Sequence, residues 1–434
     1  MRRRDFFFAA AGTLSSLELL AGIDRGFARN FEKQLSRLEG MSISASAEDE
    51  DFWGWVRSSY NLSTNLINLN NGGVSPQPSV VQEAHIRNYK FANEAPSYYM
   101  WRILDQGREA LRTRLARSGG VSPDEIAINR NSTEGLNTII FGLDLKPGDE
   151  IVLGRYDYPN MINAWKQREK RDKVKLVWID LPQPALNDEE IISLYRNAIT
   201  ARTRIVHVTH MINWTGNIVP CRAIADIAHE KGCEVIVDAA HTFGQIGFEF
   251  HETGADYLAT SLHKWLGAPF GSGLLYIRKE KIGKVWALLS NAEPDSSDIR
   301  KFESLGTRSF ASEMAIGTAI DFHNTIGIQR KEKRLRYLKD YWAQKTKGLK
   351  GARLYTSLDP DRSCGLGNIG FDGWHPHQIE GKLFERYRIH TVSIIHEDVR
   401  GIRITPNVYT TPGELDLLVK GLKEISAEEP PPVK

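Results

Sequence analysis

The sequence is poor in cysteine and has no long hydrophobic run beyond its N-terminal segment. Its 434 residues include only Cys221, Cys233 and Cys364, which are too few and too scattered for a disulfide framework or a zinc site. We expect all three to be small buried side chains. After about residue 23, no stretch reaches the roughly 18 apolar residues that a membrane-spanning helix needs. A stable membrane anchor is therefore not expected.

An excess of charge of one sign is also missing. The chain carries 56 lysines and arginines against 54 aspartates and glutamates, a net charge of +2. No basic stripe with interleaved aromatic residues stands out, which argues against nucleic-acid binding. Hydrophobic residues make up 41% and charged residues 25%, the balance of a globular protein. The length favours one large and one smaller domain.

The first 28 residues have the form of a secretion signal. The chain begins MRRRDFFF, and an apolar segment rich in small residues follows to about Ile23. The pair Arg3-Arg4, followed by x-Phe-Phe, resembles the twin-arginine signal, which exports folded proteins across the bacterial inner membrane. We expect a signal peptide over 1–28, cleaved after Ala28, and a periplasmic location. An amphipathic helix of a cytoplasmic protein is the alternative.

Beyond this leader, apolar strand-like segments alternate with polar-faced helical segments. Residues 30–60 are charged and favour a helical arm, and residues 329–349 favour a long amphipathic helix. Such alternation is typical of βαβ units with a mostly parallel sheet. The candidate buried strands are 151–153, 205–208 and 235–237.

The strongest local signal is the segment SLHKWLG at 261–267, which contains Lys264. An apolar run at 257–259 precedes it, and a glycine-rich segment at 267–273 follows it. Most lysines are solvated surface charges, but this placement indicates a lysine at the edge of a sheet. Burial lowers the proton affinity of such an amine, as Schiff-base chemistry requires.

A second signal is the segment VIVDAAH at 235–241, in which Asp238 ends an apolar strand. A buried carboxylate without a partner carries a large desolvation penalty. A protonated pyridine nitrogen is a suitable partner, and its retained proton makes a pyridoxal ring an electron sink. An aspartate that caps a following helix is the alternative.

Together, the Asp-Ala-Ala-His and Ser-x-His-Lys motifs resemble those of the pyridoxal 5′-phosphate (PLP)-dependent class V aminotransferases of fold type I, in order and spacing. This family includes cysteine desulfurases and isopenicillin-N-epimerase-like proteins, and further matches run from about residue 68 to 410. The resemblance implies an α/β fold, with a mostly parallel seven-stranded sheet flanked by helices and a smaller α+β C-terminal domain. It implies three parts after the leader. Residues 29–75 form an N-terminal arm that contributes to the small domain, residues 76–310 form the large PLP-binding domain, and residues 311–434 form the small domain.

The resemblance also assigns the cofactor contacts. Lys264 and Asp238 become the catalytic residues, and Ser132 and Thr133 open a helix whose N–H groups and dipole suit the phosphate. An ordinary helix cap explains these two residues as well. Tyr158 matches the residue that stacks on the cofactor ring, with a core tyrosine as the alternative. The remaining implied contacts are Asn213 and His241 at the phenolic oxygen and Ser261 and His263 at the phosphate.

Three further residues are implied to bind substrate or to act between subunits. Arg403 matches the arginine that forks the substrate carboxylate, with Arg400 as the alternative. Asn71 matches an asparagine near the substrate entrance, or belongs to a plain turn. Thr307 matches the threonine that reaches the phosphate in the neighbouring subunit, which implies a homodimer with shared active sites.

The chain departs from the cysteine desulfurases in the segment just before Arg403. Those enzymes carry a mobile-loop cysteine there, whereas this chain reads VSIIHED at 392–398, and Cys364 lies too early. Sulfur transfer to the enzyme is therefore not expected. The resemblance implies an aminotransferase-type enzyme acting on an amino acid or amine-bearing peptide or metabolite. With the leader, it favours tailoring of a siderophore or peptide in the periplasm. Epimerisation, β-elimination (C–S lyase chemistry) and oxidative cleavage stay open.

Two other classes of protein would give a similar pattern. A nucleotide-binding oxidoreductase would share the sheet, but the chain lacks the G-x-G-x-x-G between its first strand and helix. A non-catalytic periplasmic binding protein could share the whole fold. The presence of Lys264, Asp238 and Arg403 favours an enzyme.

Overall fold

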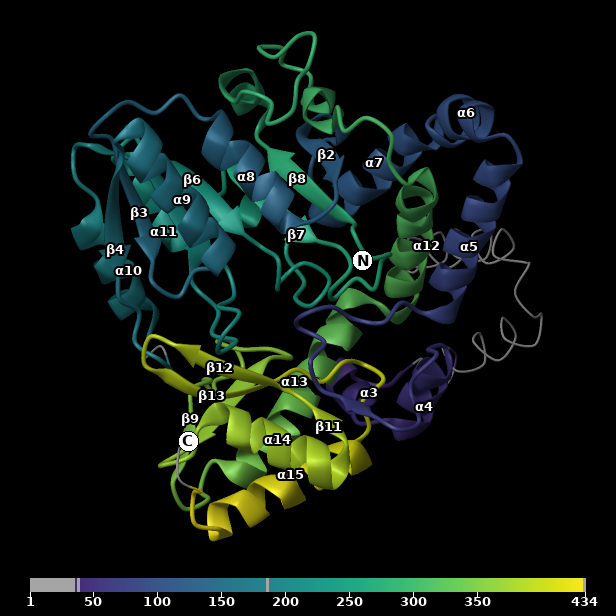
Figure 1. Cartoon of the computed structure of the whole chain (residues 1–434), viewed down its shortest axis with the longest axis vertical. Coiled ribbons are helices and arrows are strands. Elements are labelled where there is room, and N and C mark those ends of the chain that lie inside the picture. Colours follow the sequence, from purple (N-terminus) through teal and green to yellow (C-terminus); the bar gives the residue numbers. More distant parts are fainter. Residues whose placement is uncertain (1–35, 37–39, 185–186, 432–434) are drawn as a thin grey trace.

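A computed structural model describes residue 36 and residues 40–184 and 187–431. The expected export signal at 1–28 lies outside these residues. Figure 1 shows two bodies, a larger one built around one sheet and a smaller one beneath it that carries the C-terminal helices.

The large domain is organised around a seven-stranded sheet, in the order β2-β8-β7-β6-β5-β3-β4. Strands β3 to β7 run parallel, and β8 is antiparallel to both of its neighbours. The expected strands at 151–153, 205–208 and 235–237 are confirmed within β3, β5 and β6, and so is the mostly parallel sheet. The strands are β2 (Ile126–Asn129), β3 (Glu150–Gly154), β4 (Lys175–Ile179), β5 (Thr203–Thr209), β6 (Glu234–Asp238), β7 (Tyr257–Ser261) and β8 (Gly273–Ile277).

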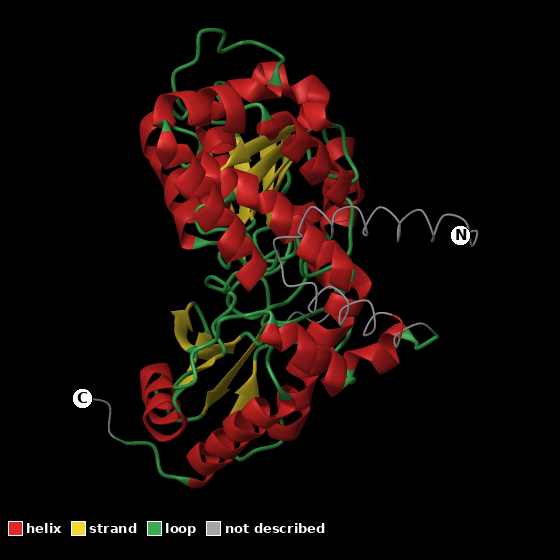
Figure 2. Ribbon diagram, turned by 90° about the vertical axis from the view of Figure 1, so that its right-hand side faces the viewer, coloured by secondary structure: helices red, strands yellow, loops and turns green. Residues whose placement is uncertain are grey.

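Helices cover both faces of this sheet, as Figure 2 shows in red around the yellow strands. Alternate strand residues point to opposite faces, so Ile205 packs with one apolar cluster and Val206 with the other. Burial on both faces explains why these strands are continuous apolar runs. The principal helices are α5 (Ser79–Glu94), α7 (Gly107–Gly119), α8 (Ser132–Gly142), α9 (Pro159–Asp172), α10 (Asp188–Ala198), α11 (Cys221–Glu230) and α12 (Phe310–Ile326).

Short helical segments join these elements. They are α6 (Pro96–Tyr98), η1 (Tyr99–Leu104), η2 (Pro123–Glu125), η3 (Phe250–Thr253), η4 (Lys279–Lys284) and η5 (Ile299–Glu303).

The small domain has a four-stranded antiparallel sheet in the order β12-β13-β10-β9. Its long helix α13 confirms the expected helix at 329–349, with bounds shifted by one to three residues. The elements are α13 (Ile328–Thr346), β9 (Ala352–Leu354), β10 (Gly367–Phe371), α14 (Pro376–Tyr387), β12 (Val392–His396), β13 (Val399–Ile404) and α15 (Pro412–Ala427).

The N-terminal arm packs on the small domain. Its helices α3 (Ile43–Ala47) and α4 (Glu50–Ser58) confirm the helical character expected for it. Strand β1 (Ile67–Asn68) pairs in parallel with β11 (Ile389–His390). Arg334 of α13 donates to the backbone oxygen of Ala47 at 3.0 Å. The arm therefore completes the small domain from the other end of the chain.

The three cysteines are buried and unpaired, as expected. Within the described residues, no helix is both long enough and apolar enough to cross a membrane.

Candidate active site

The two motifs that the sequence analysis singled out meet at one edge of the large sheet. Asp238 is the last residue of β6, and Lys264 lies in the turn after the neighbouring strand β7. Parallel strands bring their carboxyl ends to the same edge, where ligands bind in open α/β sheets. Lys264 Nζ lies 3.1 Å from His241 Nε2. The predicted amine and imidazole are therefore brought together.

The protonation of these groups follows from their burial. Burial lowers the pKa of Lys264 to about 8, against the opposing effect of the Asp238 charge. Burial also raises the pKa of Asp238, while the Ala240 N–H, 2.9 Å from Oδ1, opposes the rise. Burial, and then the charge of Lys264, lower the pKa of His241 well below its usual value. His241 is thus a neutral imidazole that can accept a hydrogen bond from the amine.

The alternative explanation for Asp238 does not hold, because turn residues rather than a helix follow it. Its side chain bonds the backbone two residues on and is buried. A buried acid with this geometry is available to a cationic partner.

Ser132 and Ser261 lie together at the start of α8. The Ser132 N–H donates to Ser261 Oγ at 3.0 Å, and the two hydroxyl oxygens are also 3.0 Å apart. Asn131, rather than Ser132, caps the helix, since its side chain accepts from Glu134 N at 2.9 Å. Thr133 is half-buried in the first turn. This turn can bind an anion through the helix N-terminus.

His263 and Tyr158 flank this edge. His263 Nδ1 lies 3.1 Å from the backbone oxygen of Ser272, so Nδ1 carries a proton and Nε2 of the neutral ring is an acceptor. A phosphate contact by His263 would then require protonation of Nε2. Tyr158 precedes α9 and is 37% exposed, which excludes the core tyrosine alternative.

Arg403 connects the two domains at the site. Its Nη1 donates to the backbone oxygen of Asn213 and its Nη2 to Asn70 Oδ1, both at 3.0 Å. Burial lowers its pKa to about 10. Arg400, in contrast, is exposed and donates to the backbone oxygens of Glu397 and Val399. Arg403 is therefore the arginine that faces the site.

Three buried polar atoms at this site have no hydrogen-bond partner within the described residues. They are Asn213 Oδ1, His241 Nδ1 and Arg403 Nε. Buried polar atoms are almost always satisfied in native proteins. Unpaired atoms of three residues that all belong to the predicted site indicate that a polar ligand completes it.

Asn70 occupies the position that the sequence analysis predicted for Asn71. Asn71 is fully buried, its amide donates to the backbone oxygens of Asn68 and Thr405, and its Oδ1 accepts from Tyr409 at 2.5 Å. Asn71 therefore supports the turn, and its substrate contact is not supported by the geometry. Sequence alone could not decide which of two adjacent asparagines faces inward.

The turn that carries Asn70 closes over the site. A Cβ added at Gly72 would lie 3.5 Å from His241 Cε1 and 3.6 Å from Arg403 Cζ. Only a residue without a side chain leaves this space open. Thr307, in contrast, is exposed between η5 and α12, and its predicted role requires a second chain.

Sequence reasoning missed a set of contacts between the domains near Tyr158. His396 at the end of β12 stacks on Trp214, with ring centroids 4.5 Å apart and an interplanar angle of 21°. Its Nε2 lies 2.8 Å from the backbone oxygen of Arg155, and Asp398 accepts from the hydroxyl of Tyr156. These residues lie far apart in the sequence and form no motif. We call them the hairpin contacts, because His396 ends β12 and Asp398 lies in the two-residue turn of the β12–β13 hairpin.

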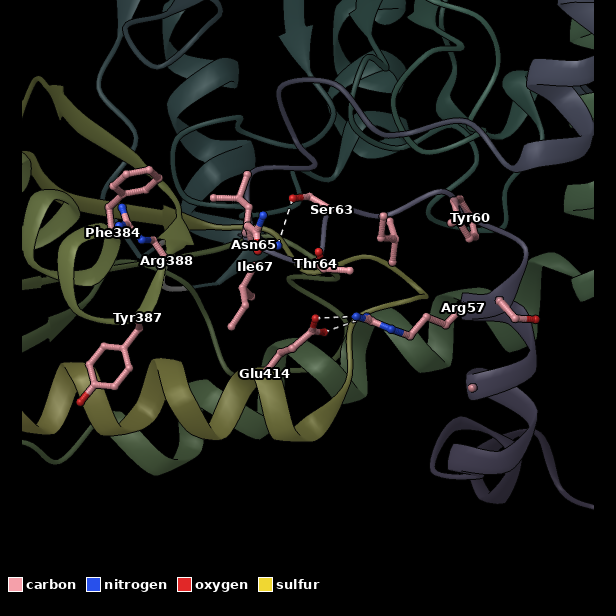
Figure 3. Close-up of a pocket in the computed structure, with 14 residues that line it drawn as sticks. Arg57, Tyr60, Ser63, Thr64, Asn65, Ile67, Phe384, Tyr387, Arg388 and Glu414 are labelled. Atoms are coloured by element: carbon pink, nitrogen blue, oxygen red, sulfur yellow. Dashed lines mark hydrogen bonds and ion pairs between the residues drawn. The ribbon is translucent and has the colours of Figure 1, made fainter.

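A separate groove of about 1140 Å³ lies between the arm and helices α14 and α15. Figure 3 shows the residues that line it. The Arg57 guanidinium forms a two-pronged ion pair with Glu414 on its wall, at 2.8 and 3.0 Å. None of the predicted site residues lines this groove. Among the described residues, no group of three histidine, cysteine or acidic side chains could hold a metal ion.

Comparisons with known proteins show which family the chain belongs to. Residues 67–393 match the family model described as aminotransferase class-V. The chain is 26% identical over 393 residues to the isopenicillin N epimerase of Amycolatopsis lactamdurans, covering 86% of this chain and 98% of that protein. It is 28% identical over 384 residues to a probable cysteine desulfurase of Halalkalibacterium halodurans, covering 83% and 93%.

A solved structure confirms the fold. The chain superposes on a lysine-to-alanine variant of C-DES, described with glycine covalently linked to its PLP cofactor, with a TM-score of 0.75. The identity is 23%, and the match covers 85% of this chain and 99% of that chain. The expected fold, a mostly parallel sheet flanked by helices with a smaller domain, is thus confirmed.

Proposed function

Because the chain belongs to the class-V aminotransferase family, we propose that it is a PLP-dependent enzyme acting at the amino group or Cα of an amino acid, an amine-bearing peptide or a related metabolite. One observation carries the proposal. The amine of the half-buried Lys264, the buried acid Asp238 and three unpaired polar atoms meet at the carboxyl edge of the large sheet.

These residues fit the cofactor. Lys264 would hold its aldehyde carbon, Asp238 its ring nitrogen, and Asn213 and His241 its phenolic oxygen. The paired hydroxyls of Ser132 and Ser261 would hold its phosphate. When bound, PLP withdraws electrons from Cα of the substrate and so weakens the bonds to that atom.

The protein groups perform the remaining work. With a pKa of about 8, about a tenth of Lys264 is a free amine at pH 7, and this amine can move a proton at Cα. His241 accepts a hydrogen bond from it and holds it in place. Arg403 binds the substrate carboxylate with a planar fork, and Asn70 orients that fork.

Transamination is the reaction we propose first, with epimerisation as the second candidate. The relationship to an isopenicillin N epimerase along 98% of its length supports epimerisation. Sulfur transfer to the enzyme has less support, because all three cysteines are buried and the desulfurase loop position is a two-residue hairpin turn. Elimination of a sulfur or other β-substituent needs no enzyme cysteine and stays an alternative.

The proposal extends to the assembly and its location. We propose a homodimer in which Thr307 reaches the partner's phosphate site. The exposed apolar side chains Ile86, Tyr89, Trp101 and Ile103 on α5 and η1 support it.

We further propose export through the leader at 1–28 and tailoring of a siderophore or peptide in the periplasm. Replacement of Arg3-Arg4 by Lys-Lys in a fusion of residues 1–35 to a reporter should block export, and unchanged export would contradict this part.

A direct test begins with cofactor binding. The purified chain, incubated with PLP, should develop visible absorbance that amino compounds change. A protein that stays colourless with PLP would contradict the whole proposal and favour a binding protein of the same fold. Reactive compounds are then incubated in D₂O with a 2-oxo acid. Deuterium at Cα with inverted configuration indicates epimerisation. A new oxo product indicates transamination, and release of a β-substituent indicates elimination.

A further inference from the structure

Asp157 is a buried acid beside the candidate site that the proposed mechanism does not use. It lies between Tyr156 and Tyr158 in the turn after β3 and is 3% exposed. Its Oδ2 accepts from the Gly154 N–H at 2.8 Å, and its Oδ1 accepts from Thr209 Oγ1 at 2.6 Å. Both carboxylate oxygens are therefore held in fixed positions.

Asp157 is aligned with Asp238 along the edge of the sheet. In the sheet order, β5 lies between β3 and β6. Thr209, which donates to Asp157, is the register partner of Asp238 in the β5–β6 pair. The carboxyls that follow β3 and end β6 thus lie on either side of the end of β5.

No ion pair joins Asp157 to another described residue, and its electrostatic neighbours include further acidic groups. Asp238 faces it from β6, the Tyr195 hydroxyl from α10 and the Cys221 thiol from α11. Burial raises the pKa of Asp157 to about 7, and the charge of Asp238 adds to the rise. A buried carboxylate without an ion-pair partner is unfavourable, so a positive charge nearby would stabilise the ionised form of Asp157.

We infer that Asp157 is a positioning residue, which in its ionised form adds a second negative charge behind Asp238 and so strengthens the binding of a protonated pyridine ring nitrogen. This inference rests on the proposed PLP site. Asp238 would contact the nitrogen, and Asp157 would act through the electric field, in an interior where charges interact more strongly than in water. A purely structural role would instead be limited to the bonds to Gly154 and Thr209.

The two roles predict different effects on ligand affinity. If Asp157 acts through its charge, removing that charge weakens only ligands with a protonated ring nitrogen, whereas a purely structural role affects all ligands equally. The Asp157→Asn variant keeps the shape of the side chain and removes its charge. Its amide oxygen can accept from Gly154 N, and its amide nitrogen can donate to the hydroxyl of Thr209, which can reverse its role. The probe pair is PLP and its analogue with CH in place of the ring nitrogen, whose ring carries no positive charge. Dissociation constants are measured by absorbance and fluorescence titration of the full chain.

We expect Asp157→Asn to weaken PLP about tenfold and to change binding of the nitrogen-free analogue less than about twofold. Asp256→Asn is the matched control, a buried aspartate just before β7 at the opposite edge of the sheet. It should leave the affinity ratio of the two ligands unchanged. Equal weakening of both ligands by Asp157→Asn would overturn the inference, as would no weakening of either.

A second variant keeps the inference testable if Asp157→Asn folds poorly. Thr209→Val removes the hydroxyl that stabilises the Asp157 carboxylate and should also lower PLP affinity more than analogue affinity. Equal effects on the two ligands would again overturn the inference. Absence of PLP binding by the unaltered chain would instead contradict the proposed function, so the two failures are distinguishable.

Discussion

Arg403 Nη1 on β13 lies 3.0 Å from the backbone oxygen of Asn213, so a small-domain strand and a large-domain loop meet inside the candidate site. Asn368 Nδ2 bonds the oxygen of Trp214 at 3.0 Å, and Thr356 Oγ1 bonds that of Thr215 at 2.5 Å. The arginine proposed to bind the substrate is therefore positioned by the loop that carries Asn213, a proposed cofactor contact.

Replacement of Arg403 should act on the substrate carboxylate. We expect Arg403→Ala to lower kcat/KM for carboxylate-bearing amines by roughly 30-fold or more, because a charge-assisted pair contributes about 2 kcal/mol or more. Amines without a carboxylate should be affected much less. Arg400→Ala, on the exposed face of the same strand, serves as the control in steady-state assays. A comparable loss from Arg400→Ala would transfer the role to that residue.

Replacement of Lys264 should remove the covalent attachment of the cofactor. Lys264→Ala should yield no borohydride-stable adduct by mass spectrometry, whereas the exposed-site variant Lys279→Ala should keep it. Loss of the general acid–base group should also slow exchange of the Cα proton by about 10²- to 10⁴-fold. An adduct that persists in Lys264→Ala would show that another amine holds the cofactor.

The capture of an aldehyde by Lys264 should depend on pH. Its pKa of about 8 lies below the usual lysine value because burial disfavours the ammonium form. Below pH 8 the free-amine fraction falls about tenfold per pH unit, so the capture rate should fall likewise and level off above pH 8. Stopped-flow absorbance between pH 6 and 10 measures this profile. The charge of Arg403 also lowers this pKa, so the midpoint should rise in Arg403→Ala. A midpoint near 10.5 in the unaltered chain would contradict the burial of the amine.

Substitutions of Asn70 and Asn71 should differ in their effects, one acting mainly on substrate binding and the other mainly on stability. Asn71→Ala leaves buried partners unsatisfied and should lower the free energy of unfolding by roughly 2 kcal/mol. Asn70→Ala should lower it less and should mainly weaken binding of carboxylate substrates, because Asn70 orients Arg403. Urea denaturation and ligand titration of both variants test this assignment, which the reverse pattern would contradict.

The hairpin contacts should shield Trp214 from solvent. His396→Ala removes the ring that stacks on Trp214, so tryptophan emission should shift to longer wavelength and acrylamide quenching should increase. His377→Ala, on an exposed part of α14, should change neither. Unchanged quenching in His396→Ala would show that other side chains cover Trp214.

The central features of the site could be predicted because they are local in sequence. Asp238 and Lys264 each end or follow an apolar strand, and parallel strands bring such residues to one edge. Asp157 was missed because its bonds to Gly154 and Thr209 become meaningful only when β3 and β5 are neighbours. His396 was missed for the same reason, since its partners Trp214 and Arg155 lie more than 180 residues earlier in the chain. Periodicity predicts elements, but contacts between domains depend on how those elements pack.

The parallel pairing of β1 with β11 joins Ile67 to Ile389, 322 positions later in the chain (389 − 67). During synthesis, Ile389 must emerge from the ribosome before Ile67 can pair with it. The large domain, complete in sequence by then, is free to fold first. A chain truncated before Ile389 would retain the strands of the large sheet but would lose Arg403 and leave the arm without its strand partner.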